Sequence, residues 1–409
     1  MLVGYLKQTI RGISWMGGLR GVTRIIAFAK TAILARLLLP AQFGLFGIAG
    51  LMLELLEVLT ETGINIVLVQ EKKDIDEYIN TAWIVSIVRG VLIAFFIVLA
   101  APYISLFFRS PESVPLLHLM SMVPLIRGFI NPSEVKFQKK LEFNKEFWFR
   151  FTIFSLDTLA AVTLAYTTHS PAALIWGLIV GGLSEVVLSF VFTKPRPRLV
   201  FEKEKLKSIV SRGKWMTGAG IFSYLFQHGD DIVVGRLMGQ SPLGLYQVAY
   251  RISTLPITEV SDTIGKVTFP VYVGISEDKG RLKRAYLRML LGICLLVIPF
   301  GLLLFVFARQ LTLVLLGENW IEAIPVLKVL AVFGSLKAVI NSCYPLLLGL
   351  GRQKQVMIIT LAGIIGMGLS VVPLTLKYGL VGTASSTIIG LMLSVPFAFY
   401  FSKKALEES

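Results

Sequence analysis

Long apolar stretches recur from one end of this 409-residue chain to the other, with Val91–Ala101 and Leu290–Phe307 among them. About 20 apolar residues in a helix cross a hydrocarbon core of roughly 30 Å. Hydrocarbon offers no water to the backbone, so a spanning segment has to be a helix or part of a closed barrel. The apolar runs are continuous and do not alternate with polar residues, which favours helices. We therefore predict an all-α polytopic membrane protein.

The composition supports this prediction. The chain is 55% hydrophobic and only 16% charged, whereas a soluble protein carries about 25% charged residues. We expect about twelve transmembrane helices. Their predicted ranges are 13–38, 43–69, 79–101, 113–133, 148–168, 171–193, 215–237, 243–272, 285–307, 323–348, 355–376 and 378–401.

Lys and Arg are distributed unevenly between the loops that join these spans. Clusters lie at 136–150, at 194–214 and at 279–288, whereas the loops on the other side hold isolated residues such as Arg109 and Arg309. The positive-inside rule then predicts that both termini are cytoplasmic. The net charge of +15 is therefore explained by basic residues of the cytoplasmic loops, which lie beside anionic lipid headgroups. We expect no nucleic-acid partner.

A repeat relates the two halves of the chain. Arg36–Ala49 resembles Arg236–Ala249 at a constant offset, with Arg, Leu, Gly, Leu and Ala coinciding, and Trp15-Met16 matches Trp215-Met216 at the same offset. Parallel repeats of this kind are related by an axis along the membrane normal. We predict two parallel-oriented six-helix lobes around a central cleft. The predicted boundaries are 1–193 for the first lobe, 194–214 for a cytoplasmic linker with an interfacial helix, and 215–409 for the second lobe.

Several basic residues fall inside the predicted spans, where an ionised group costs on the order of 3 kcal/mol. Arg20 and Arg24 share one helical face, and Arg251 lies on a polar stripe of another helix. We predict that these three face an aqueous cleft and bind substrate. For Arg89 and Lys337, substrate binding and structural ion pairing both remain open.

Other lysines and arginines lie nearer the ends of the spans. We expect the side chains of Lys30, Lys328 and Arg127 to extend to the membrane interface, as long basic side chains do.

Acidic residues in the spans have two readings, charge balance and ion coupling. Glu54 and Glu57 are expected to balance the arginines of the cleft, with coupling to H⁺ or Na⁺ as the alternative. Asp231, together with Asp230, either caps a helix broken at Gly229 or pairs across the cleft. Asp262 belongs to the polar stripe that carries Arg251.

The residues that support catalysis or metal binding in other proteins are sparse. Cys294 and Cys343 lie in apolar helices, where packing is the expected role, and no CxxC motif or His/Cys cluster occurs. We predict no metal site, no cofactor and no enzymatic activity.

Four segments carry a resemblance to a known family: Ile33–Phe46, Asp230–Arg251, Leu315–Pro325 and Tyr378–Gly382. They resemble the bacterial polysaccharide transporters, the Wzx-type O-antigen and exopolysaccharide flippases. The family belongs to the multidrug/oligosaccharidyl-lipid/polysaccharide (MOP, MATE-like) exporter superfamily. Its members often have fourteen spans, more than the number predicted for this chain.

The resemblance implies a flippase of the bacterial plasma (inner) membrane. Its substrate would be a polyprenyl-pyrophosphate-linked oligosaccharide, moved from the cytoplasmic to the outer leaflet by alternating access. Membrane lipids, and the polysaccharide polymerase and export machinery, are the implied partners. A cation-coupled multidrug or small-molecule exporter of the same fold remains as the alternative, although the arginines within the spans suit an anionic substrate better.

Overall fold

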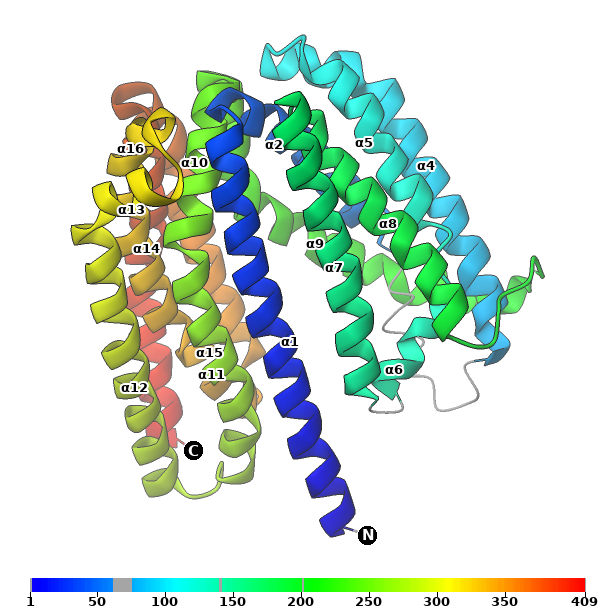
Figure 1. Ribbon diagram of the computed structural model, residues 1–409. Helices are drawn as coiled ribbons and strands as arrows, with labels where there is room; N and C mark the ends of the chain where they lie inside the picture. The colour runs from blue at the N-terminus through cyan, green and yellow to red at the C-terminus, as the bar shows by residue number, and fades with distance from the viewer. Residues whose placement is uncertain (1, 62–75, 140–141, 201, 409) are drawn as a thin grey trace. The chain divides into compact units, whose positions relative to one another are not determined.

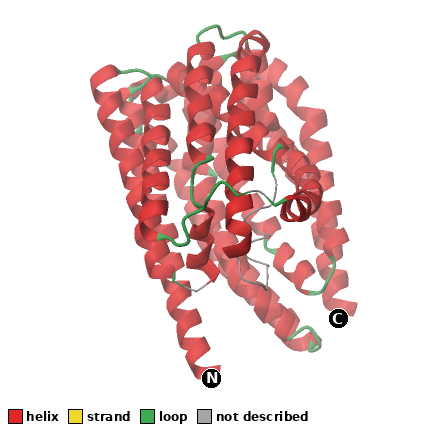
Figure 2. Cartoon of the chain, turned by 90° about the vertical axis from the view of Figure 1, so that its right-hand side faces the viewer, coloured by secondary structure: helices red, strands yellow, loops and turns green. Residues whose placement is uncertain are grey.

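The computed structural model describes residues 2–61, 76–139, 142–200 and 202–408, and places side chains within them except at 2–16, 20, 77, 203–219, 255 and 408. Throughout these ranges every regular element is a helix (Figure 2). The predicted all-α class is thus confirmed. The chain divides into two compact units, Met1–His228 and Gly229–Ser409.

The first unit begins with two helices joined by a short turn. It contains α1 (Leu2–Leu37), α2 (Pro40–Leu59), α4 (Asp76–Phe108), α5 (Ser113–Arg127), η1 (Pro132–Glu134), α6 (Val135–Lys139), α7 (Phe143–Thr168) and α8 (Ala172–Phe192).

Helix α5 lies at the centre of this unit, packed against α2, α4 and α8 (Figure 1). Leu117 and Met120 of α5 are fully buried between Ile97 of α4 and Ile175 of α8. Such burial of apolar side chains contributes about 1.5–3 kcal/mol for each large residue. These side chains form a packed apolar core around the buried face of α5.

The predicted span 113–133 is interrupted. Helix α5 ends at Arg127, and the chain re-enters a helix at Pro132 after a bend of 65°. Asn131 has an extended backbone, as residues before proline prefer, and its side-chain oxygen accepts a hydrogen bond from the Ser133 amide at 2.9 Å. An Asn cap followed by Pro is a strong local helix start, so a new helix begins here at a different angle.

The second unit contains α10 (Gln240–Ser253), α11 (Leu255–Gly274), α12 (Lys279–Val306), α13 (Ala308–Leu315), η2 (Glu318–Ala323), α14 (Ile324–Asn341), α15 (Cys343–Gly349) and α16 (Gln353–Glu408). Helix α14 is central, packed against α10, α11, α12 and α16. Its Ala331 and Ala338 are buried among Ile257, Ile293 and Val297.

Helix α16 folds back on itself at Gly379, whose φ of 60° and ψ of −141° are not helical. A side chain at Gly366 would lie 3.0 Å from the Gly390 Cα, so the two arms of α16 touch through their backbones. Ser394 also donates a hydrogen bond to the Ile359 carbonyl across the arms, at 2.9 Å. The two last predicted spans are therefore the arms of one helical hairpin.

Seven helices are long and apolar enough to cross a membrane, or eight with the bent pair α5–α6, as judged by length and composition in the described residues. The predicted number of about twelve spans is not confirmed. Helix α1, helix α9 (Lys203–Met238) and the α10–α11 pair are absent from this set. They coincide with the predicted spans 13–38, 215–237 and 243–272, two of which carry the cleft arginines Arg20, Arg24 and Arg251.

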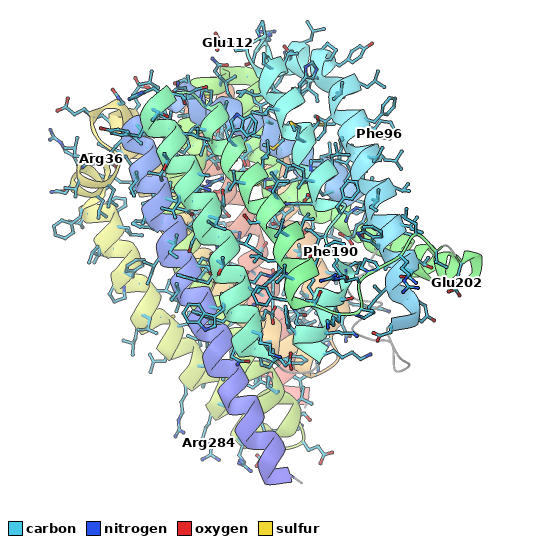
Figure 3. All side chains as sticks on the ribbon, turned by 45° about the vertical axis from the view of Figure 1, so that its right-hand side comes forward. Arg36, Phe96, Glu112, Phe190, Glu202 and Arg284 are labelled. Carbon is cyan, nitrogen blue, oxygen red and sulfur yellow. The ribbon has the colours of Figure 1, made fainter. Side chains whose placement is uncertain are left out.

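Large apolar side chains cover the outer faces of several of the apolar helices. On α4, Phe95, Leu99 and Leu106 are 59%, 56% and 73% exposed, and Phe96 projects outward from the same helix (Figure 3). Soluble monomers rarely expose apolar patches of this extent. These faces are suited to lipid, so the protein is a multi-pass membrane protein.

The boundary between the units falls inside α9, after His228. Helix α9 begins at Lys203, so residues predicted as an interfacial helix and residues predicted as a span form one continuous helix. It also passes through Gly229 without interruption, and the predicted helix break at Gly229 is therefore wrong. The three predicted domain ranges stay predictions.

Candidate functional site

A polar pocket of about 450 Å³ lies inside the first unit. Helices α2, α4, α5, α7 and α8 and the η1 turn all contribute to its wall. Three arginines and four glutamates are part of its lining, which consists of Glu57, Glu61, Ser86, Arg89, Gly90, Ile93, Pro124, Arg127, Gly128, Ile130, Pro132, Glu134, Arg150 and Glu185. We refer to it below as the unit 1 pocket.

A close helix contact brings two of the arginines together. A Cβ atom added at Gly90 of α4 would overlap the Pro124 carbonyl oxygen, and one at Gly128 would lie 2.9 Å from the Ser86 carbonyl oxygen. Only glycine allows two backbones to approach so closely. Arg89 and Arg127 directly precede these glycines, so the contact places both arginines at the same pocket.

Arg89 is held by the end of α2. Its guanidinium donates to the Glu57 carbonyl oxygen at 2.7 Å and to the Thr60 hydroxyl at 3.1 Å, and lies 3.7 Å from the Glu61 carboxylate. The last carbonyls of a helix lack intrahelical partners and attract a cation. These contacts fit the structural interpretation of Arg89, and substrate binding by this residue, which also lines the pocket, stays a prediction.

Arg127 has far fewer contacts. Its Nη1 lies 3.8 Å from Glu57 Oε1, beyond hydrogen-bonding distance, and its buried Nε has no hydrogen-bond partner. The side chain is 40% exposed and lines the unit 1 pocket. Extension of this side chain to the membrane interface stays a prediction.

Arg150 also lines the pocket and binds two carboxylates. Its guanidinium contacts Glu134 at 3.0 Å and also bonds Glu185. The three residues come from α7, η1 and α8, so this cluster ties three separate elements together. Sequence analysis assigned Arg150 to a basic loop and did not detect the cluster, because the acidic partners are distant in sequence.

Two further ion pairs join helices of the first unit. Lys30 of α1 donates to both carboxylate oxygens of Asp157 on α7, at 2.8 and 2.9 Å. Lys30 therefore does not extend to the interface as predicted. Glu54 of α2 lies 2.9 Å from His228 Nε2, and Glu57 lies 3.8 Å from Arg127. Balance of Arg20, Arg24 and Arg251 by these two glutamates stays a prediction.

Lys337 is half-buried on α14 in the second unit. The ammonium lies 3.3 Å from the Tyr250 hydroxyl and 5.3 Å from the centre of the Phe333 ring. No carboxylate of the described residues forms an ion pair with it. Between substrate binding and ion pairing, the structure thus disfavours ion pairing for Lys337. Lys328, in turn, lies over the Phe305 ring.

The remaining predicted site residues have different surroundings. Arg24 on α1, Arg251 on α10 and Asp262 on α11 are exposed, and Asp231 is half-buried. The Arg20 side chain lies outside the described side chains. The shared cleft of Arg20, Arg24 and Arg251 therefore stays a prediction.

Asp230, next to Asp231, is buried and accepts a hydrogen bond from the Tyr246 hydroxyl at 2.6 Å. This bond links α9 to α10 within the second unit. Across the described residues no group of His, Cys, Asp and Glu is placed to hold a metal ion.

The fold matches that of known transporters. The lipid II flippase MurJ in an inward closed conformation has a TM-score of 0.74 at 14% identity, over 95% of this chain and 90% of that chain. An inward-facing multidrug resistance MATE family transporter of the MOP superfamily has a TM-score of 0.71 at 16% identity, over 94% and 95%. The chain therefore has the fold of the MOP superfamily of transporters.

The sequence model of one family matches residues 33–325, and its description is "Polysaccharide biosynthesis protein". The match covers well over half of the chain, and the chain belongs to this family.

Curated relatives are similar over most of the chain. The lipopolysaccharide biosynthesis protein WzxC of Escherichia coli is 25% identical, over 85% of this chain and 71% of the relative. The teichuronic acid biosynthesis protein TuaB of Bacillus subtilis is also 25% identical, over 85% and 72%. The succinoglycan biosynthesis transport protein ExoT of Rhizobium meliloti is 24% identical, over 85% and 70%. The predicted family is confirmed.

Proposed function

We propose that this protein is a flippase that moves a polyprenyl-pyrophosphate-linked oligosaccharide from the cytoplasmic to the outer leaflet. The observation that carries the proposal is membership of the polysaccharide biosynthesis family over residues 33–325. The relatives WzxC, TuaB and ExoT are named for three different surface or secreted polysaccharides. All three names refer to the biosynthesis of a polysaccharide, and ExoT is named a transport protein, so the polysaccharide differs between these relatives.

The chemistry of the membrane-embedded residues suits an anionic substrate. A lipid-linked diphosphate carries roughly two negative charges, and guanidinium groups bind phosphate oxygens with matching fork geometry. The predicted ligands in the cleft are Arg20, Arg24 and Arg251. The glycan would occupy the wet cleft while the polyprenyl tail remains in lipid.

Transport by alternating access needs a source of energy. An inside-negative potential favours outward movement of an anion by about 2.3 kcal/mol per charge per 100 mV. A second source is coupling to H⁺ or Na⁺ through an acidic residue, for which Glu57 is the predicted candidate. We place the protein in the bacterial plasma membrane with both termini cytoplasmic, on the distribution of Lys and Arg between the loops.

The roles of other components follow from this function. We assign the protein no enzymatic step, because lipid translocation makes and breaks no covalent bond. The translocated repeat unit would pass to a polysaccharide polymerase and export machinery, which are the proposed partners beside the membrane lipids.

The test uses Arg24→Ala and Arg251→Ala, each beside its Lys replacement, in a bacterium whose own flippase gene is deleted. We expect the alanine variants to insert normally but to lose surface polymer and accumulate lipid-linked repeat units. The lysine variants should retain part of the activity because the charge remains. Normal polymer from folded alanine variants would contradict the roles of Arg24 and Arg251, and no polymer from the wild-type chain would contradict the flippase proposal.

The multidrug exporter is the alternative that the same fold permits. It predicts efflux of fluorescent cationic dyes that depends on Glu57. We expect no such efflux, because the arginines predicted for the cleft, Arg20, Arg24 and Arg251, would repel a cationic substrate.

A further inference from the structure

The three arginines of the unit 1 pocket differ in how fully the protein satisfies them. Arg150 binds two carboxylates, and Arg89 donates two hydrogen bonds to the end of α2. The guanidinium of Arg127 donates no hydrogen bond to any described residue. A guanidinium has five N–H donors, and Arg127 is the one of the three arginines that keeps all five available to a ligand.

The location of Arg127 is enforced by the backbone. Val88-Arg89-Gly90 and Ile126-Arg127-Gly128 are two copies of one short pattern on α4 and α5, and their glycines form the close contact between these helices. Helix α5 then ends at Arg127, where the 65° bend begins. Two arginines are thereby fixed beside one another, which a flexible loop would not achieve.

A plain structural role explains part of this arrangement. A cation in the last turn of a helix interacts favourably with the helix dipole, and Arg127 occupies that position in α5. The dipole attraction does not, however, supply acceptors for the guanidinium N–H groups. A buried donor without an acceptor is costly, and an oxyanion would remove that cost.

The charges restrict where in the pocket an anion binds. Arg150 is outnumbered by its partners Glu134 and Glu185, which would repel an anion. Arg127 lies 3.8 Å from Glu57, and this long contact leaves room for a competing acceptor. The pocket volume of about 450 Å³ lies within the range of small-molecule sites, about 300–1,000 Å³.

We propose that Arg127 binds an oxyanion of the transported substrate in the unit 1 pocket, with Arg89 beside it and with Glu57 as the group that the anion displaces. The oxyanion is either the diphosphate of the lipid carrier or the carboxylate of an acidic sugar, since both present paired oxygens to a guanidinium fork. This site is separate from the predicted arginines of the cleft. It rests on the proposed function, because that function supplies a substrate with such groups.

The experiment measures binding of two probes, inorganic diphosphate and glucuronate. Each is titrated calorimetrically into the full chain in phosphatidylcholine nanodiscs. Wild type is compared with Arg127→Gln, Arg127→Lys and Glu57→Gln. Arg309→Gln is the matched control, because Arg309 is exposed on α13 in the second unit and its replacement removes the same charge elsewhere.

We expect Arg127→Gln to weaken binding of at least one probe by about tenfold or more, as loss of charge-assisted hydrogen bonds does. Arg127→Lys should lose less, since it keeps the charge but not the fork. Glu57→Gln should bind more tightly because a competing acceptor and a like charge are removed. A response to diphosphate alone identifies the lipid carrier as the source, and a response to glucuronate alone identifies the sugar.

Wild-type affinity for both probes in a folded Arg127→Gln variant would overturn the proposal, as would an equal loss in the Arg309→Gln control. Absence of binding to either probe by the wild type would also overturn it. Folding is checked by gel filtration and thermal unfolding. Translocation of a lipid-linked oligosaccharide is measured on the same preparations. Translocation by the wild type with unchanged binding in Arg127→Gln rejects only this site, whereas no translocation by the wild type rejects the proposed function.

Discussion

The two units both bury basic residues in an apolar helix bundle, but they accommodate them in different ways. In the first unit, Arg150 lies between the carboxylates of Glu134 and Glu185. In the second unit, Lys337 lies against the Tyr250 hydroxyl and the Phe333 ring. An ion-pair network requires each of its members, because removing one leaves buried charge behind. A lysine on an aromatic ring leaves only apolar and neutral groups behind when it is replaced.

The largest expected effect is that of Arg150→Ala. Glu134 and Glu185 are only 16% and 12% exposed, and without the arginine they are like charges with no cation between them. We expect a loss of about 3 kcal/mol in the free energy of unfolding, at the lower end of the range for broken buried pairs because Arg150 is itself partly exposed. The measurement is unfolding of the purified chain in detergent.

The control for this prediction is the triple variant Arg150→Met, Glu134→Gln, Glu185→Gln. It removes all three charges, so most of the lost stability should return. If Arg150→Ala unfolds like the wild type, the cluster is not a structural network and the contrast between the two units fails.

The next effect concerns how closely helices approach in each unit. A methyl group at Gly90 would overlap the backbone carbonyl of Pro124, which cannot rotate away. At Gly301 in the second unit the obstacle is the Ser335 hydroxyl, which can change rotamer. We expect Gly90→Ala to destabilise by about 2 kcal/mol. Gly301→Ala should be close to neutral because alanine favours the helix by about 1 kcal/mol.

Thermal unfolding of the two glycine variants side by side makes this comparison. Gly292→Ala on α12, where nothing lies within 4 Å of the added methyl group, is the control for helix propensity alone. Equal losses in Gly90→Ala and Gly301→Ala would show that the α4–α5 contact is not unusually rigid.

The smallest effect is expected for Lys337→Met. The ring contact contributes about 0.5–1 kcal/mol, and burial of the ammonium opposes it. The free energy of unfolding should therefore change by less than about 1 kcal/mol. Lys337→Glu should be clearly destabilising, because a carboxylate would face the electron-rich face of Phe333. A loss in Lys337→Met as large as that in Arg150→Ala would remove the distinction between the units.

Sequence analysis succeeded where the relevant signal is local. Apolar stretches of sufficient length predicted the helical class, and Lys377–Tyr378 marked the turn between the two arms of α16 within two residues of Gly379. The four quoted segments led to the correct family. All of these depend on composition or short motifs, which are properties of neighbouring residues.

Local sequence patterns do not predict contacts between side chains that are distant in sequence. Lys30 and Arg127 lie near the ends of predicted spans, where long basic side chains extend to the interface. Their actual surroundings are Asp157 on α7 for Lys30 and the unit 1 pocket for Arg127. The one available signal for Arg127, the repeated Arg-Gly pattern on α4 and α5, becomes meaningful only once these helices are known to touch.

The sequence by itself determined that this protein is a helical membrane transporter of the polysaccharide family. The reason is that the length of each apolar stretch and the short family motifs are properties of consecutive residues. The tertiary structure decided which charges neutralise one another and which arginine keeps its donors available. The strength of an ion pair decreases over a few ångströms of separation. Helical periodicity specifies the helix face on which a residue lies, but not which helix packs against that face.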